Sequence, residues 1–485
     1  MPAICRRVRY FGRMLDLVHG TAARIAAGVA AGAVSAVDVV AAHLARIAAV
    51  DPVLRAFVDV RAEAALAEAA EQDARAASGQ PRGPLGGVPV TVKSAIEVAG
   101  LRCETGSPSR RGQRAAADAV VVRRLRAAGA IVLGTTNVAE MLMAYETDNP
   151  LHGRTSNPWD HDRTPGGSSG GEAAAIAAGC SAGGIGSDGG GSVRVPAHFT
   201  GLCGLKPTPG RVPSTGHQPA CLGPFSLIGV VGPMARTVED VGLLYRAVAG
   251  WDGTDPLATP LPALPAGSWP PPTVAWFDAH PGAPVTPATE AAVTAAATAL
   301  ATQGYPAGPQ RPLAFDRATT LWDLFFGDLG ELLLAESLAG RERKLPIIAA
   351  LHAERGPRPV LSASAVVHAW IERDLVRAAL LAEMRDYDVV VCPVTAVPAF
   401  RHGERAWTIA GRIVGYLEAM VYTQWANILG LPAAVVRAGW SPEGLPLGVQ
   451  VIGRPFEEHL VLDVAAAIER GCGGWVAPPA AGLPA

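Results

Sequence analysis

Lysine is scarce in this chain. Of 41 lysine and arginine residues, only three are lysines: Lys93, Lys206 and Lys344. A lysine in a chain that otherwise uses arginine can have a chemical role, because a buried lysine can lose its proton near neutral pH and arginine cannot. Lys93 ends the apolar run Gly87-Val-Pro-Val-Thr-Val-Lys93. This run predicts a buried strand that delivers an amine to an interior site.

Other absences exclude whole classes of protein. The formal net charge is -2 and no dense run of Lys and Arg occurs, which argues against nucleic-acid binding. No apolar stretch is long enough to span a membrane, and no stretch has the apolar h-region of a signal peptide, so we expect neither feature. The seven cysteines lack CxxC spacing and favour free thiols in a reducing compartment, so we expect a cytoplasmic protein. No H-E-x-x-H or comparable cluster is present, so we expect neither a metal nor a cofactor.

Helical and strand signals alternate along the first part of the chain. With 485 residues, 49% of them hydrophobic, the chain can bury a large core in several domains or in one large domain. Helices are expected over residues 21–48, 61–77 and 116–129. Strands are expected to end at Lys93 and to cover residues 130–133. This alternation predicts an α/β fold.

The second half begins with a composition shift. Residues 256–273 are rich in proline and predict a linker. Beyond it the sequence predicts a strand at 274–277, a helix at 287–303, a largely helical region at 314–385, a strand at 388–392 and a hairpin formed by 431–437 and 446–452. At the ends, residues 1–18 carry four arginines and predict a disordered arm, and residues 476–485 predict a loose tail.

Two stretches rich in serine and glycine carry the functional signal. They are Pro165-Gly-Gly-Ser-Ser-Gly-Gly-Glu172 and Gly186-Ser-Asp-Gly-Gly-Gly-Ser-Val-Arg194. A serine among glycines can serve as a nucleophile, and the neighbouring backbone N–H groups can hold an oxyanion. The alanine-rich segment 172–178 predicts a helix whose positive end faces the first stretch. Together these features indicate an enzyme.

Single motifs within these stretches give weaker alternatives. Residues 166–170 fit the G-x-S-x-G elbow of α/β-hydrolases, but no histidine stands in a distinctive setting to complete a triad. His198 is expected to be a packed histidine. Residues 184–189 fit G-x-G-x-x-G, but no acidic residue occurs between Gly190 and Glu239 to bind a ribose. A serine nucleophile with a desolvated lysine as its base remains.

Six blocks of sequence, in order, resemble the amidase signature family. They are Gly83-Pro-Leu-Gly-Gly-Val-Pro-Val-Thr-Val-Lys93, Gly134-Thr-Thr-Asn137, Asn157-Pro-Trp-Asp160, Gly166-Gly-Ser-Ser-Gly-Gly171, Asp188-Gly-Gly-Gly-Ser-Val-Arg194 and Gly204-Leu-Lys-Pro-Thr208. The resemblance runs from about residue 20 to 470. It implies a single large α/β domain over 19–475, with a central mixed β-sheet flanked by helices. A variable helical insert on the substrate side is expected at about 255–385.

The resemblance also implies a Ser–cisSer–Lys triad. By motif, Ser192 is the nucleophile, Ser168 the bridging serine after a cis peptide at Gly167, and Lys93 the base. Ser169 is expected to support the site by hydrogen bonds. The oxyanion hole is expected from backbone N–H groups of Gly189, Gly190, Gly191 and Ser192. This chain departs from the family at Ser94, where Asp is common, and at Gly189, where Thr is common, but every triad position is kept.

The family pattern also suggests which residues surround the substrate. Leu142 and Met143, with Tyr145 nearby, are expected to line the acyl pocket, and Trp322, Phe325 and Phe326 of the helical insert to form a lid. These side chains are mostly apolar, so we expect uncharged aryl or alkyl amides as substrates. Carbamates (urethanes) and esters present the same carbonyl and are compatible with such a site.

Two alternatives stay open at this point. The main rival within the same fold is the glutaminase (A) subunit of a tRNA-dependent amidotransferase, which would need partner subunits and a charged clamp for free glutamine. The chain could also be a non-catalytic binding protein on the same fold, although an intact Lys93, Ser168 and Ser192 set argues against this. We expect a small-molecule amide or carbamate as the binding partner, no nucleic acid, no membrane, and a monomer or homodimer.

Overall fold

A single mixed β-sheet organises the protein. The computed structural model describes residues 17–261, 269–330 and 361–479. Eleven strands form the sheet in the order β1-β3-β2-β4-β6-β5-β12-β13-β9-β7-β8. They are β1 (Phe57–Val60), β2 (Pro89–Lys93), β3 (Ile131–Thr136), β4 (Gly183–Asp188), β5 (Cys203–Lys206), β6 (Val230–Ala235), β7 (Val274–Trp276), β8 (Ala307–Pro309), β9 (Val389–Pro393), β12 (Ala433–Trp440) and β13 (Pro446–Gly453). A separate ribbon pairs β10 (Ala406–Ile409) with β11 (Arg412–Gly415).

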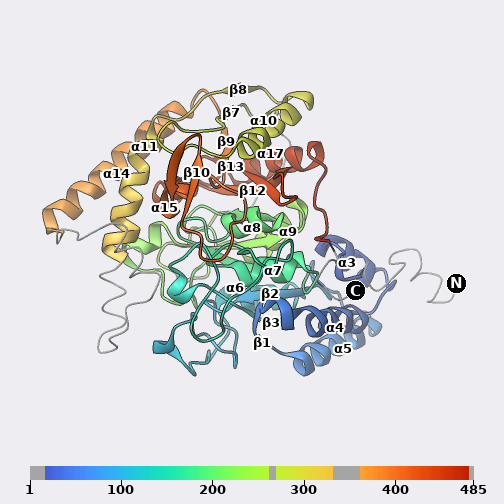
Figure 1. Cartoon of the computed structure of the whole chain (residues 1–485). Coiled ribbons are helices and arrows are strands. Elements are labelled where there is room, and N and C mark those ends of the chain that lie inside the picture. Colours follow the sequence, from blue (N-terminus) through green and yellow to red (C-terminus); the bar gives the residue numbers. More distant parts are fainter. Residues whose placement is uncertain (1–16, 262–268, 331–360, 480–485) are drawn as a thin grey trace.

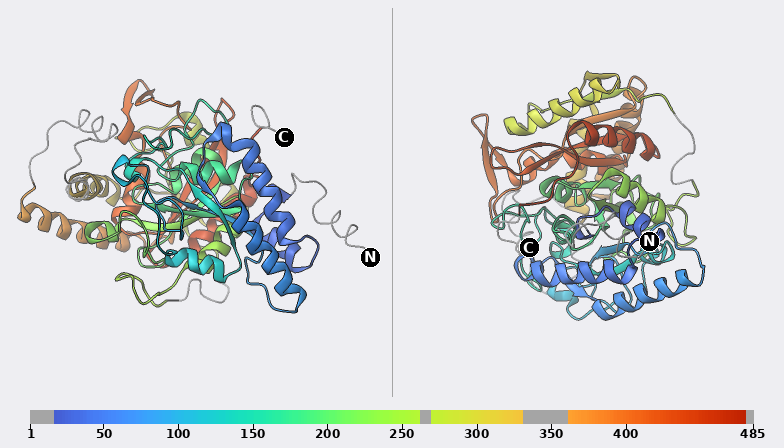
Figure 2. Two further views of the ribbon diagram at one scale, coloured as in Figure 1. Left: turned by 90° about the horizontal axis from the view of Figure 1, so that it is seen from below. Right: turned by 90° about the vertical axis from the view of Figure 1, so that its right-hand side faces the viewer.

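Helices flank the sheet. The α-helices of the described residues are α3 (Ala22–Ala30), α4 (Ala36–Leu54), α5 (Ala62–Ala77), α6 (Val120–Ala127), α7 (Gly170–Ala177), α8 (Arg194–Thr200), α9 (Val238–Val248), α10 (Pro287–Thr302), α11 (Ala314–Trp322), α14 (Ala363–Glu383), α15 (Tyr416–Ala419), α16 (Val421–Ile428) and α17 (Glu458–Gly471). Helices α3, α4 and α5 lie at one end of the molecule and α10 at the other (Figures 1 and 2). The large mixed sheet with its helices confirms the predicted α/β fold.

The core divides into two clusters, one on each face of the sheet. Along β12, Val436 belongs to the cluster that also holds residues of α4, α9 and α17, whereas Val435 belongs to the cluster of α8, α14 and α16. Adjacent residues of a strand point to opposite faces, so this alternation shows that both faces of the sheet are covered. Nearly continuous apolar sequence made six strands predictable: β2, β3, β7, β9, β12 and β13. The other strands, β1, β4, β5, β6 and β8, were not predicted.

Most predicted elements are present, with shifted ends. The hairpin is confirmed, because β12 and β13 pair antiparallel around residues 441–445. The helix expected over 116–129 begins only at Val120, since the N–H of Ala119 donates to Glu97 O and the carboxylate of Asp118 accepts from Ala99. These bonds hold the chain before Val120 outside the helix.

The expected arm, tail and insert fall partly outside the described residues. Of the arm, residues 1–16 are not described, and of the tail, residues 480–485 are not. The expected linker shows no helix or strand in its described parts, 256–261 and 269–273. In the insert, α11 continues through a π-helical segment at Asp323–Asp328, residues 331–360 are not described, and α14 begins at Ala363.

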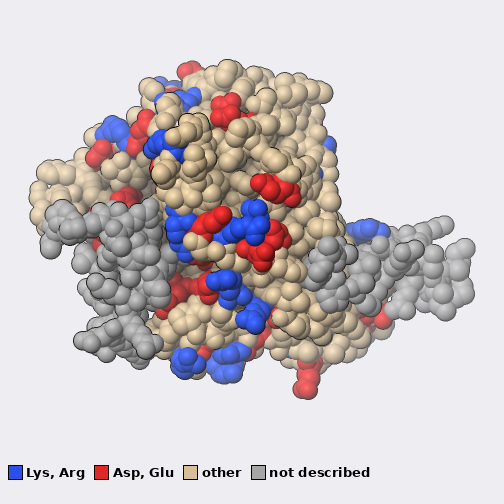
Figure 3. Space-filling view, viewed as in Figure 1, with Lys and Arg blue, Asp and Glu red and all other residues tan. Residues whose placement is uncertain are grey.

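The face drawn in Figure 3 carries few charged side chains, and their signs are mixed. In Figure 3, basic and acidic side chains lie interspersed, without a broad area of one sign. Among the described residues, no helix combines the length and the apolar character that crossing a bilayer requires.

Candidate active site

The candidate site lies where two parallel strands end. β2 and β4 are neighbours and run parallel. β2 ends at Lys93 and β4 ends at Asp188, so the lysine meets the glycine loop, residues 189–191, at one edge of the sheet. The carboxyl ends of parallel strands are the usual place for a ligand site in an open α/β sheet. The strand that the sequence predicted from the apolar run before Lys93 therefore delivers its amine as expected.

Lys93 is fully buried and has three oxygen neighbours. Its Nζ lies 2.7 Å from Ser168 Oγ, 3.0 Å from Ser187 Oγ and 3.3 Å from Ser187 O. Burial lowers the pKa of Lys93 to about 7, although the nearby carboxylate of Asp188 acts in the opposite direction. A large fraction of this amine is therefore neutral at physiological pH.

Ser168 is held at the start of α7. A cis peptide joins Gly167 to Ser168, as the family pattern implied. A side chain on Gly167 would begin 2.5 Å from the backbone nitrogen of Glu146, so only glycine fits there. The next residue, Ser169, donates its N–H to Ser192 O at 3.2 Å, and its hydroxyl accepts from Ser187 N at 3.4 Å. Ser169 thus joins the two serine loops, the supporting position that was expected of it.

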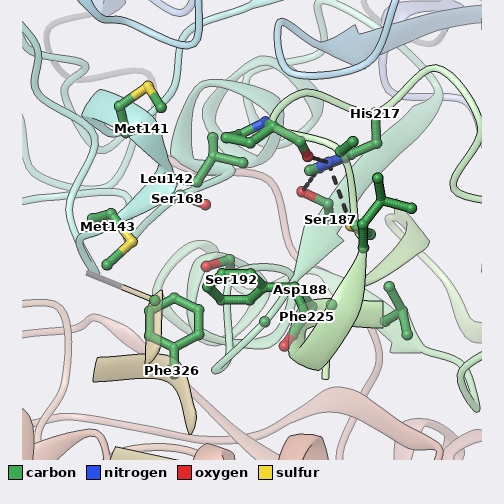
Figure 4. Close-up of a pocket in the computed structure, with 18 of the residues that line it drawn as sticks. Met141, Leu142, Met143, Ser168, Ser187, Asp188, Ser192, His217, Phe225 and Phe326 are labelled. Carbon is green, nitrogen blue, oxygen red and sulfur yellow. Dashed lines mark hydrogen bonds between the residues drawn. The ribbon is translucent and has the colours of Figure 1, made fainter. Parts of the chain in front are cut away.

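Ser192 follows the glycine loop, just before α8. Its side chain is largely buried, with 9% exposed, and it faces the same cavity as Ser168. The cavity has a volume of about 350 Å³. Figure 4 shows the Ser168 and Ser192 hydroxyls facing this space from adjoining loops.

A buried ion pair fixes the glycine loop. Arg194 Nη2 lies 3.0 Å from Asp188 Oδ1, and both side chains are inaccessible to solvent. Burial alone would raise the pKa of Asp188, but Arg194 holds it well below its usual range. The carboxylate of Asp188 accepts from Gly191 N at 2.7 Å. The N–H of Gly191 is therefore already engaged, and those of Gly189, Gly190 and Ser192 remain the candidate oxyanion donors.

The cavity wall is mostly apolar. Of the expected pocket residues, Leu142, Met143 and Phe326 line it. Several further residues line the cavity without having been predicted from the sequence: Met141, His217, Cys221, Leu222 and Phe225. In Figure 4 the two methionines and Leu142 stand at the upper left of the space, and Phe326 and Phe225 lie below them. Met141 and Leu142 adopt positive φ angles of 48° and 66°, which bring this segment against the cavity.

Tyr145 and Trp322 have a different position from the expected one. The Tyr145 hydroxyl donates to Gly190 O at 3.0 Å, and Trp322 Nε1 donates to Gly189 O at 2.9 Å. Thr423 Oγ1 also donates to Gly190 O, at 2.5 Å. These side chains hold the carbonyl groups of the glycine loop, which orients the N–H groups on its other side. Phe325, expected in the lid, is buried in the core against Trp370.

Gly189 makes room for an aromatic wall. Trp322 and Phe326 stack with ring centroids 4.7 Å apart, and Phe225 meets Phe326 edge-on. A Cβ on Gly189 would lie 3.0 Å from Phe326 Cε2. The threonine that is common in the family at this position would press on Phe326. Glycine at position 189, where the family commonly has threonine, therefore leaves the space that the Phe326 ring occupies.

Two other residues that the sequence singled out, His198 and Lys206, are buried and hydrogen-bonded to their neighbours. His198 is buried and bonds Gly448 N and Thr395, as expected of a packed histidine. Lys206 is buried, and its Nζ donates to Pro207 O at 3.1 Å. Within the described ranges, no group of three or more His, Cys, Asp or Glu side chains is arranged to hold a metal ion.

Comparison with known proteins identifies the family. A family model described as Amidase matches residues 38–462. The chain belongs to the amidase family. It is therefore a hydrolase that acts on C–N bonds.

Similar proteins within the family are named for different activities. An indoleacetamide hydrolase of Bradyrhizobium diazoefficiens is 36% identical over 453 residues, covering 92% of this chain and 86% of the relative. The A subunit of a glutamyl-tRNA(Gln) amidotransferase from an Anaeromyxobacter species is 36% identical, and the match covers 93% of this chain and 96% of the relative. The solved structure of a bacterial aryl acylamidase of the amidase signature family superposes with a TM-score of 0.82 at 26% identity, covering 93% of this chain and 96% of that one.

Proposed function

We propose that this chain is a serine amidohydrolase that cleaves small, uncharged amides through an acyl-enzyme on Ser192. The observation that carries the proposal is the buried Lys93 Nζ at 2.7 Å from Ser168 Oγ, with Ser168 and Ser192 both lining one mostly apolar cavity. Desolvation lowers the pKa of Lys93 to about 7, so the amine can act as a base at neutral pH.

In the proposed mechanism the proton moves from Ser192 through Ser168 to Lys93. Neutral Lys93 accepts a proton from Ser168 while Ser168 accepts one from Ser192, and Ser192 Oγ attacks the substrate carbonyl carbon. The resulting oxyanion is held by N–H groups of the glycine loop. The tetrahedral adduct collapses as the proton returns through Ser168 to the leaving nitrogen, and the amine departs. A water molecule then attacks the acyl-enzyme by the same path and releases the acid.

The electrostatics of the cavity favour neutral substrates. Asp188 is the charged residue among the described lining residues, and Arg194 neutralises it behind the wall. Burying an ionic substrate group without a partner costs several kcal/mol. The aromatic side chains of Phe225 and Phe326 instead suit a planar apolar group. Aryl and alkyl amides fit this site, and carbamates and esters offer the same carbonyl.

The glutaminase alternative predicts different groups in the cavity. Free glutamine carries an ammonium and a carboxylate, and a site that selects it needs an opposite charge for each. Asp188 is already paired, and no lysine or arginine is among the described lining residues. The cavity therefore favours a stand-alone amidase over the glutaminase component of a larger complex.

The test is a substrate panel with the purified chain. Nitroanilides, aliphatic amides, aryl carbamates, aryl esters and glutamine are compared for wild type and for Ser192→Ala. Ser78→Ala, at an exposed position after α5, is the matched control. We expect hydrolysis of the anilides, loss of at least about a thousandfold in Ser192→Ala, and no effect of the control. Unchanged activity in Ser192→Ala would overturn the mechanism, and a strict preference for glutamine would overturn the substrate class.

A further inference from the structure

His217 is a buried residue at the candidate site that the proposed mechanism does not use. Its side chain lines the cavity and only 6% of the residue is exposed. Its Nε2 lies 2.9 Å from Ser187 Oγ, and Ser187 Oγ lies 3.0 Å from Lys93 Nζ. Figure 4 shows the contact between His217 and Ser187. A continuous line of polar atoms thus connects His217 to the amine.

The contact of His217 Nδ1 shows which ring nitrogen carries the hydrogen. Nδ1 lies 2.8 Å from Pro219 O, and a carbonyl oxygen can only accept a hydrogen bond. Nδ1 therefore carries the proton. Burial lowers the pKa of His217 to about 4, so the ring is neutral near pH 7. In a neutral imidazole with Nδ1 protonated, Nε2 is an acceptor.

This acceptor fixes the hydroxyl of Ser187. Ser187 Oγ has one hydrogen, which it donates to His217 Nε2. Its lone pairs then face Lys93, so Ser187 Oγ accepts an N–H from the amine. The carbonyl oxygen of Ser187 accepts the second N–H of the neutral amine, at 3.3 Å. The third neighbour of Nζ is Ser168 Oγ, and the lone pair of the amine points to it.

We propose that His217 is a positioning residue that sets the direction of the hydrogen-bond chain from Pro219 through Ser187 to Lys93, so that the lone pair of Lys93 faces Ser168. This inference rests on the proposed function. Without an acceptor at His217, the Ser187 hydroxyl is free to turn and donate to the lone pair of Lys93. The base would then be occupied by Ser187 in place of Ser168.

The surrounding titratable groups leave this chain of hydrogen bonds intact near neutral pH. Asp188 and Glu172 act on Lys93, and Cys221 Sγ lies 3.5 Å from His217 Nδ1. Arg194 keeps Asp188 ionised. Burial raises the pKa of Glu172 to about 8 and that of Cys221 to about 12. Neither Cys221 nor His217 therefore changes its charge between pH 5 and 9. Glu172 titrates within this range, but its carboxyl is bonded by Thr91 and Thr136 and makes no bond to Ser187 or His217.

The test compares His217→Leu with His217→Gln on the nitroanilide that the wild type cleaves fastest. Leucine cannot accept a hydrogen bond, whereas the amide oxygen of glutamine can take the place of Nε2. We expect kcat of His217→Leu to fall about 10- to 100-fold and His217→Gln to recover most of the loss. Equal activity of all three proteins would overturn the inference, as would a glutamine variant that is no better than the leucine variant.

The pH profile separates positioning from simple disruption. When Ser187 donates to the neutral amine, it stabilises that form, so the acidic limb of kcat/KM in His217→Leu should move to lower pH, by up to about one unit. Entry of water into a damaged site would remove the desolvation of Lys93 and move the limb to higher pH. A shift to higher pH therefore contradicts the inference.

A double variant tests whether His217 acts through Ser187. If it does, His217→Leu combined with Ser187→Ala should lose no more activity than Ser187→Ala alone. Losses that multiply would show an independent role and overturn the inference. Failure of the proposed function is a separate result, because it appears as activity that survives Ser192→Ala, whatever the His217 variants do.

Discussion

Trp322 Nε1 donates to the carbonyl oxygen of Gly189 at 2.9 Å. Trp322 belongs to α11, in the insert that was expected to vary, whereas Gly189 belongs to the loop before the candidate nucleophile. The insert is thus bonded directly to the loop that we expect to hold the oxyanion. Its contribution goes beyond covering the substrate, because it orients a peptide group next to the reaction centre.

Removal of this single donor should lower the rate. Trp322→Phe keeps a ring to stack on Phe326 but loses the bond to Gly189 O. We expect kcat to fall about tenfold with a loss of about 1 kcal/mol in the free energy of unfolding. Steady-state kinetics and urea unfolding measure both. Trp251→Phe, at a site 60% exposed, is the control and should change neither. An unchanged kcat in Trp322→Phe would contradict the orienting role.

The candidate base should dominate the pH dependence. The neutral amine is the active form, so protonation of Lys93 removes activity as the pH falls. With its pKa lowered to about 7 by burial, kcat/KM should rise up to about pH 7 and level off above it. Lys93→Arg should be inactive at every pH, because a guanidinium stays protonated. A flat profile from pH 5 to 9, or an active arginine variant, would show that another group is the base.

The glycine at 189 should determine the fit of the aromatic wall. Gly189→Ala places a Cβ 3.0 Å from Phe326 Cε2, so Phe326 must move. We expect KM for aryl amides to rise severalfold, and the double variant with Phe326→Leu to recover part of the loss. Gly308→Ala is the control, since a Cβ there meets nothing within 4 Å. An additive double variant would mean that Gly189 and Phe326 act independently.

Glu172 should make stability depend on pH. This carboxyl is fully buried and bonded by Thr91 and by Thr136, the latter at 2.8 Å. Burial raises its folded-state pKa to about 8, above the unfolded value of 4.5. A raised folded pKa means stability that is present below the unfolded pKa and lost as pH rises through the folded pKa.

The Glu172→Gln variant should not lose this stability as the pH rises, because glutamine does not ionise. The melting temperature of the variant, relative to wild type, should increase between pH 5 and pH 9, and calorimetry at several pH values measures it. Glu71→Gln, an exposed position on α5, should show no such trend. A constant difference across this range would contradict a neutral, buried Glu172.

The sequence predicted what depends on local pattern. The apolar run before Lys93, the alanine-rich α7 and the hairpin of β12 and β13 are visible as periodicity and turn chemistry. The candidate triad could be assigned because its residues stand in short blocks. These features need no knowledge of distant contacts.

The rest depends on contacts between distant segments. Trp322 is 133 residues from Gly189, so its bond to that carbonyl has no local signal. His217 is one of eleven histidines and its partner Ser187 lies 30 residues upstream. The engaged N–H of Gly191 also escaped prediction, because the loop had to fold around Asp188 before that bond could be seen.

The central claim is an acyl-enzyme on Ser192, and trapping it is the most direct test. The chain is quenched with acid during turnover of a slowly hydrolysed aryl carbamate, digested and analysed by mass spectrometry. We predict one added carbamoyl group on the peptide that contains Ser192, absent in Ser192→Ala and accumulating as the aryl alcohol is released. Release of the alcohol by wild type without a modified Ser192, or with the group on another residue, would contradict the account.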